Sequence, residues 1–123
     1  MARKTIHAAD VALKRAYDPP AKEDGARILV DRLWPRGVKK DTAAIDRWLK
    51  EISPSTELRK WFGHDPDRWP EFQRRYTLEL QEHSELLEEL RALARKGPVT
   101  LVYSAHDEAH NNAVVIRDVL LDG

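Results

Sequence analysis

Three segments of the chain carry the apolar pattern of β-strands. Residues 11–17, VALKRAY, alternate between two sets of side chains, as the two faces of a strand do. The segment 27–33 holds the unbroken apolar run Ile28-Leu29-Val30 between a glycine and a proline, and 99–103, VTLVY, is almost entirely apolar. Such runs are typical of strands that are buried on both faces. We therefore predict strands over 11–17, 27–33 and 99–103.

Helical spacing dominates the rest of the chain. Apolar residues recur three and four positions apart over 41–51, 55–62 and a long stretch from 65 or 66 to about 96, where Lys-Gly-Pro stops the pattern. The same spacing returns over 110–121. We predict a helix for each of these four segments, with a loop over 104–108.

The order of these elements predicts an α/β fold. A strand, a long helical crossover and a second apolar strand form a βαβ unit, whose strands run parallel with a right-handed connection. We expect a small, mostly parallel sheet with a long helical crossover and a C-terminal helix, in a three-layer, Rossmann-like arrangement. At 123 residues the chain is expected to form one domain over 1–123, with 1–10 as an N-terminal extension. The link PPAKEDGA is short, so the direction of the first strand stays open.

The composition narrows the function classes. Lysine plus arginine and aspartate plus glutamate number 21 each, so no global positive field favours DNA or an anionic membrane as a partner. The absence of cysteine excludes disulfides, zinc-thiolate sites and thiol nucleophiles. No apolar run is long enough for a signal peptide or a membrane span. We expect a cytoplasmic protein, and the sequence does not determine its oligomeric state.

The motif VDRLWPRG, at the end of the second predicted strand, is the first candidate site. Ligands of open α/β sheets bind at the carboxyl ends of the strands. Arg32 and Arg36 offer planar guanidinium groups for carboxylate or phosphate, and Trp34 offers a ring face. Asp31 is a candidate acid or base. In the structural alternative, Asp31 and Arg32 form an ion pair and Trp34 fills the core.

The loop SAHDEAHNNA, after the last strand, is the second candidate site. Backbone N–H groups at a helix N-terminus favour an anion, and His106, Asn111 and Asn112 add polar contacts. Asp107 is the second candidate acid or base. In the alternative, Asp107 is the N-cap of the final helix and His110 lies near its third position. The order HDEAH differs from HExxH, so we predict no metal site and no cofactor.

Three further histidines have less specific surroundings. His64 precedes Asp65, and this pair is either a general base with its acid or, in the interpretation we favour, part of a helix cap. His83 lies on the apolar stripe of the long predicted helix, so we expect a core histidine. His7 is expected at the surface.

The motifs KRAYDPP, DGARILVDRLWPRG, WLKEISPSTELRKWFGHDPDRWPEF and GPVTLVYSAHDEAHNNAVVI together resemble the YeaO-like group of domain-of-unknown-function family number 488. The resemblance runs from about residue 11 to residue 121. It implies a compact α/β fold with a small, mostly parallel sheet and no established reaction. Longer relatives have a full helix between the first two strands and a Cys-His-Arg run after the last one, where this chain has PPAKEDGA and His110-Asn111-Asn112. His106 stands where close relatives are expected to have a basic residue.

Two classes of function follow from these residues. In the first, the protein binds an anionic small molecule, phosphate- or nucleotide-like, at the carboxyl ends of its strands, with any acid/base role limited to the two aspartates. In the second, it is an interaction or regulatory module without catalysis, and it touches nucleic acid locally through Arg32, Arg36, Lys39 and Lys40. The first class predicts converging arginines in a concave site, and the second predicts arginines paired with acids. The proposed ligand-binding residues of the first class are Arg32, Trp34, Arg36, Tyr103, His106, Asn111 and Asn112.

Overall fold

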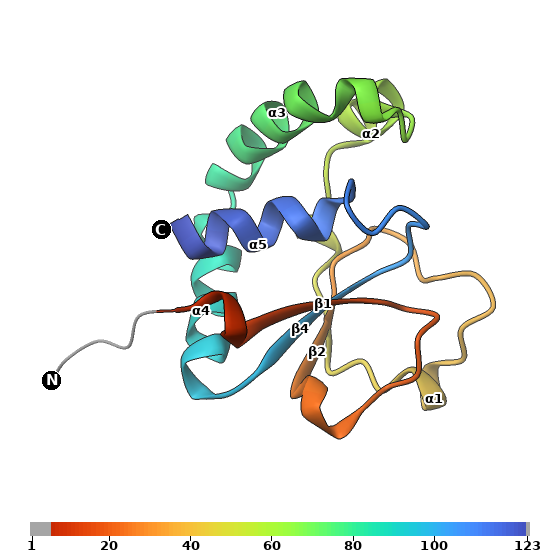
Figure 1. The fold of residues 1–123 in the computed structure, drawn as a ribbon, viewed down its shortest axis with the longest axis vertical. Coiled ribbons are helices and arrows are strands. Elements are labelled where there is room, and N and C mark those ends of the chain that lie inside the picture. Colours follow the sequence, from red (N-terminus) through yellow and green to blue (C-terminus); the bar gives the residue numbers. More distant parts are fainter. Residues whose placement is uncertain (1–5, 123) are drawn as a thin grey trace, which may run out of the picture.

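The sheet has four parallel strands in the order β1-β4-β2-β3 (Figure 1). The computed structural model describes residues 6–122. Its strands are β1 (Val11–Arg15), β2 (Ala26–Leu29), β3 (Arg47–Trp48) and β4 (Val99–Tyr103). The predicted α/β class is confirmed, and the open direction of the first strand is settled, because β1 pairs parallel with β4.

Five α-helices are present among residues 6–122, where the sequence predicted four. α2 and α5 correspond to predicted segments, and Ser55 caps α2 by accepting a hydrogen bond from the Leu58 N–H at 3.2 Å. None of the helices within residues 6–122 is both long and apolar enough to cross a membrane. The helices are α1 (Lys40–Ala43), α2 (Thr56–Phe62), α3 (Trp69–Gln81), α4 (Ser84–Lys96) and α5 (Asn112–Asp122), with 3-10 turns η1 (Ala8–Asp10), η2 (Lys22–Asp24), η3 (Lys50–Ile52) and η4 (Pro66–Arg68).

The main hydrophobic core lies between one face of the sheet and the helices α2 to α5. Side chains alternate along a strand, so Val99, Leu101 and Tyr103 of β4 share a face. All three belong to a buried cluster that includes Phe72 and Tyr76 of α3 as well as side chains of α4 and α5. Figure 1 shows α3 and α5 on the same side of the strands. This packing leaves the carboxyl ends of the strands facing away from α4.

The opposite face of the sheet is covered by short segments and a buried polar network. Asp24 of η2 pairs with Arg27 of β2 at 2.6 Å and with Lys14 of β1 at 3.1 Å, and its carbonyl accepts from Thr100 of β4 at 2.8 Å. Burial acts to raise the pKa of Asp24, but hydrogen bonds from the Ala21 backbone, Lys14 and Arg27 together bring it below its ordinary value. The two faces of the sheet are therefore covered differently. Helices pack on one face, and short segments joined by ion pairs cover the other.

The predicted helix over 41–51 is wrong. The short helix α1 ends at Ala43, the C-cap residue Ala44 has a left-handed backbone at φ 54°, and the chain then runs alongside β2 as β3. The backbone N–H groups of Asp46 and Leu49 donate to carbonyls of β2 at 2.8 and 2.9 Å. The edge of β2 has hydrogen-bonding groups that need partners, and pairing with this segment satisfies them.

The long predicted helix is two helices. α3 ends at Gln81 and α4 begins at Ser84, with His83 in a non-helical conformation at the N-cap (φ −110°, ψ 42°). His83 is therefore half-buried at a helix start rather than in the core. The apolar positions stay in phase across the break, so the sequence pattern could not reveal it.

Candidate functional site

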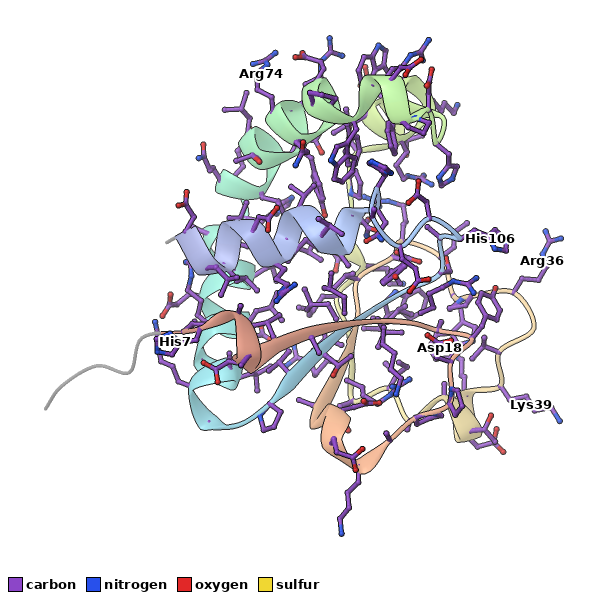
Figure 2. The ribbon with its side chains drawn as sticks, viewed as in Figure 1. His7, Asp18, Arg36, Lys39, Arg74 and His106 are labelled. Carbon is purple, nitrogen blue, oxygen red and sulfur yellow. The ribbon has the colours of Figure 1, made fainter. Side chains whose placement is uncertain are left out.

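A groove of about 1140 Å³ lies at the carboxyl ends of the strands. It is lined by the end of β1, the segment 31–36 after β2, the loop 104–112 after β4, and residues 53–64 around α2. Both candidate sites of the sequence analysis therefore contribute to one concave surface. Figure 2 shows Arg36 and His106 projecting from the same side of the molecule, one from each loop.

The groove is rich in positive charge. Two carboxylates line it, those of Asp31 and Asp107, against five cationic side chains. Among residues 6–122, no acidic side chain forms an ion pair with any of these five cations. The Nε atom of Arg32 is buried and has no hydrogen-bond partner among residues 6–122. The five cations are Arg15, Arg32, Arg36, Arg59 and Lys60.

Asp31 joins three elements at the floor of the groove. Its Oδ2 accepts hydrogen bonds from the Ser104 N–H at 2.9 Å and from the Ser104 hydroxyl at 2.6 Å. Its Oδ1 accepts from the Asn112 amide at 3.1 Å, and its carbonyl accepts from the Trp48 indole at 2.7 Å. The carboxylate thus holds the end of β2 against the end of β4 and the start of α5. The alternative ion pair between Asp31 and Arg32 does not form.

The loop after β4 is organised by its own side chains. Asp107 accepts hydrogen bonds from the Ala109 N–H at 2.9 Å and the His110 N–H at 3.1 Å, and its Oδ2 lies 2.8 Å from His110 Nδ1. The hydrogen bond to His110, with help from the two backbone N–H groups, lowers the pKa of Asp107 below its ordinary value. The alternative in which Asp107 is the N-cap of the final helix is wrong, because α5 begins at Asn112 and the Asn111 side chain accepts from the Val114 N–H at 3.2 Å.

Both loop asparagines are engaged within the protein. Asn111 is buried, at 3% exposure, and its amide donates to the Asp107 carbonyl at 2.9 Å. The Asn112 amide donates to the Val30 carbonyl at 3.0 Å and to Asp31. They line the groove, but their amide hydrogens already bond to the protein. These residues therefore shape the loop that carries the groove wall.

The two predicted stacking residues have different positions. Trp34 lines the groove, with its indole N–H donating to the Val38 carbonyl at 2.6 Å and its ring edge-on to Trp48 at 5.6 Å. Tyr103 is only 2% exposed and lies in the core, where burial raises the pKa of its hydroxyl. Of the two rings, only Trp34 reaches the groove.

Sequence reasoning did not assign several residues that line the groove. Arg15 is the last residue of β1 and Tyr17 follows it, and Arg15 Nε donates to the Ala105 carbonyl at 2.9 Å. The signal for these two was their place at the end of a strand, but it required knowing that β1 runs parallel to β4. Arg59 and Lys60 belong to the exposed side of α2, and no sequence signal indicated which surface that helix faces.

The histidines supply no metal site in the described structure. Asp65 caps η4 by accepting from the Asp67 N–H at 3.0 Å and pairs with Arg68 at 3.7 Å, so it does not orient His64. His7 is exposed, as predicted, at the end of the molecule opposite the groove (Figure 2). Across residues 6–122, no group of three or more histidine, aspartate or glutamate side chains is arranged to hold a metal ion.

Comparison with known proteins gives a consistent set of relatives. Residues 10–123 match a family described as the inactive DUF488-N3 subclade. The chain is 48% identical over 111 residues to the uncharacterized protein YeaO of Escherichia coli (strain K12), covering 90% of this chain and 96% of that protein. It is 41% identical over 110 residues to an uncharacterized protein of Mycobacterium tuberculosis (strain H37Rv), covering 89% and 92% of the two chains. No solved structure matches the sequence.

Proposed function

Because the chain belongs to the DUF488 family, in a subclade described as inactive, we propose that it binds an anionic, phosphate- or nucleotide-like small molecule in the groove without turning it over. One observation carries this proposal: five cationic side chains line one concave site and have no acidic partner within residues 6–122. Like charges gathered in a cleft repel one another and raise the local concentration of anions. A bound anion relieves that repulsion.

The arginines contact the ligand directly in this proposal. Arg32 and Arg36 come from the loop after β2, and Arg59 and Lys60 come from α2 on the other wall. The planar guanidinium group donates two parallel hydrogen bonds to carboxylate or phosphate, which suits a clamp. His106, exposed beside Arg15 at 3.4 Å, adds a polar contact at the rim. In this arrangement the anion lies between the loop after β2 and helix α2.

The two aspartates act as organisers in this proposal and not as an acid and a base. The hydrogen bonds that the carboxylates of Asp31 and Asp107 accept come from loop and helix-start groups, and they hold the wall of the groove in place. Asn111 and Asn112 have the same role through their amides. This assignment agrees with the description of the subclade as inactive.

The interaction-module alternative is less well supported. It predicts that Arg32 and Arg36 pair with acids and that no concave site is present. Neither expectation agrees with the groove and its unpaired arginines. Nucleic acid remains an alternative ligand for the same cations, since a phosphate backbone and a free phosphate share the same chemistry.

A thermal-shift screen tests the proposal. The protein is melted with inorganic phosphate, sugar phosphates, nucleotides and dicarboxylates, alongside the variants Arg36→Gln and Lys39→Gln. Both residues are exposed and three positions apart, but only Arg36 lines the groove. A ligand at 100 times its dissociation constant should stabilise the wild type by about 2.7 kcal/mol.

The two variants distinguish binding at a defined site from long-range electrostatic attraction of the anion. We expect the thermal shift to be lost in Arg36→Gln and retained in Lys39→Gln. Equal losses in both variants would indicate long-range attraction without a defined site. No shift with any compound, while Arg36→Gln alone melts early, would make Arg36 structural and favour the interaction module.

A further inference from the structure

Two exposed apolar side chains lie on the cationic groove. Leu33 is 70% exposed and Tyr17 is 46% exposed, and both line the groove. Within residues 6–122, Leu78 is the only other large hydrophobic side chain with such exposure. A scattered apolar residue at a surface needs no explanation, but two beside a cluster of cations give the site an apolar as well as a charged component.

Tyr17 is exposed and yet held in place. Its hydroxyl donates to the Arg36 carbonyl at 3.0 Å. The Arg15 guanidinium lies 5.1 Å from the centre of its ring, and Arg15 is itself held by the Ala105 carbonyl at 2.9 Å. A ring that is already positioned loses little conformational freedom when a ligand stacks on it. Tyr17 therefore has the features of a stacking platform.

Trp34 does not have these features to the same degree. Its indole N–H is used by the Val38 carbonyl, its ring packs edge-on against Trp48, and it is half-buried. Its contacts are those of a side chain that stiffens the loop after β2. The aromatic surface offered to a ligand is thus mainly that of Tyr17.

The ring lies beside the backbone of the residue that carries the proposed anion contact. Tyr17 is hydrogen-bonded to the backbone of Arg36, the residue whose guanidinium carries the proposed anion contact. A ligand that uses both must have a flat ring close to its negative charge. The groove, at about 1140 Å³, has room for such a ligand, because small-molecule sites typically measure roughly 300–1000 Å³.

We propose that Tyr17 is a specificity-determining residue that stacks on the ring of a nucleotide-like ligand, whose phosphate lies against Arg36. This inference rests on the proposed function, because it assumes that an anion binds in the groove. It narrows the ligand from any phosphate to one that carries a flat base. Stacking of a base on an aromatic side chain commonly strengthens binding by about tenfold or more.

Calorimetric titration of the full chain tests the inference. The probes are ribose 5-phosphate and the 5′-monophosphates of adenosine, guanosine, cytidine and uridine, which share the sugar and phosphate and differ in the base. We expect at least one nucleotide to bind about tenfold tighter than ribose 5-phosphate. The readout is this ratio of affinities, which cancels any change in the phosphate contact.

Two variants of Tyr17 assign the ratio to the ring. In Tyr17→Leu the ratio should fall close to one, because the side chain stays apolar but is no longer flat. In Tyr17→Phe the ratio should stay near the wild-type value, because the ring remains while the hydrogen bond to Arg36 is lost. A circular dichroism spectrum of each variant verifies that it is folded.

The possible failures are distinguishable. If the nucleotides bind no tighter than ribose 5-phosphate, the inference is overturned and the proposed function stands. If the ratio persists in Tyr17→Leu, another group contacts the base and the assignment of Tyr17 is wrong. If neither ribose 5-phosphate nor any nucleotide binds, the proposed function and the inference both fall.

Discussion

The substitution Asp31→Asn tests whether this carboxylate organises the groove. One carboxylate oxygen accepts two hydrogen bonds from Ser104, at 2.9 and 2.6 Å, and the other accepts one from the Asn112 amide at 3.1 Å. Asparagine keeps a single acceptor oxygen. At best the two bonds from Ser104 survive without the negative charge, and the new amide nitrogen then faces the amide nitrogen of Asn112.

The expected loss follows from these contacts. A hydrogen bond to a charged group stabilises a protein by about 1.5–3 kcal/mol, and one between neutral groups by about 0.5–1.5 kcal/mol. Losing one bond and weakening two gives an upper value of about 3–5 kcal/mol on the same scale. Because Asp31 is half-buried, solvent reduces the effect, and we expect about 2–3 kcal/mol.

Urea unfolding followed by circular dichroism measures this loss. Asp18→Asn is the control, because Asp18 is exposed at the same end of the molecule (Figure 2) and its carboxylate forms no hydrogen bond within residues 6–122. The control should unfold within about 0.5 kcal/mol of the wild type, as surface substitutions usually do. If Asp31→Asn also stayed within that margin, the organising role would be refuted.

Phosphate titration of the same variant gives a second readout. Removing a negative charge from a cationic groove should leave phosphate affinity unchanged or increase it. A large loss of affinity in Asp31→Asn at full stability would mean that Asp31 contacts the ligand directly.

Three further changes test the fold that supports the groove. Gly25→Ala should destabilise the protein in urea unfolding by about 1–3 kcal/mol more than Gly37→Ala, because both glycines have positive φ (64° and 80°) but, of the two, only a Cβ at Gly25 would clash with a backbone carbonyl oxygen, that of Pro98. Equal losses would contradict this. Asp24→Asn should lower the thermal stability at pH 7. The difference in melting temperature between wild type and variant should shrink as the pH falls below 3.8, the ordinary pKa, because folding lowers the pKa of Asp24 and the stability that its charge contributes is lost as the carboxylate is protonated. A constant difference down to low pH would contradict the ion-pair account. Tyr76→Phe should cost about 1–3 kcal/mol in urea unfolding, because the buried Ile52 carbonyl loses its hydrogen-bond donor; a neutral outcome would show another donor replacing it.

The central strand could be predicted from sequence to the residue. The segment 99–103 is an almost entirely apolar run that starts after Gly97-Pro98 and ends at a polar loop, and β4 has the same bounds with all five residues buried. Such a run is stable only where both faces are covered, so the pattern itself carries the tertiary information. The helix caps at Ser55 and Gly63 were predictable for a similar reason, because capping is local chemistry.

The segment 40–52 shows where a local pattern is insufficient. Ile45, Trp48, Leu49 and Ile52 have helical spacing, but the chain leaves the helix at Ala44 and pairs with β2. The unpaired backbone groups at the edge of β2 form hydrogen bonds with this segment, and this pairing favours a strand over a helix. The break at His83 was also not predictable from local pattern, because the spacing of apolar residues does not indicate where a helix changes direction.

The sequence by itself determined that the segments 31–36 and 104–112 lie at the edge where the parallel strands end, because this follows from strand direction and short connections. Only the tertiary structure decided what surrounds them. The parallel pairing of β1 with β4 brought Tyr17 to the groove, and the packing of α2 added Arg59 and Lys60. It also turned Asp31 and Asp107 toward backbone and amide donors and left the arginines without acids. Where a strand ends depends on the local sequence pattern, so it was predictable. Which side chains contact one another in the groove depends on packing between segments far apart in the sequence, so it was not.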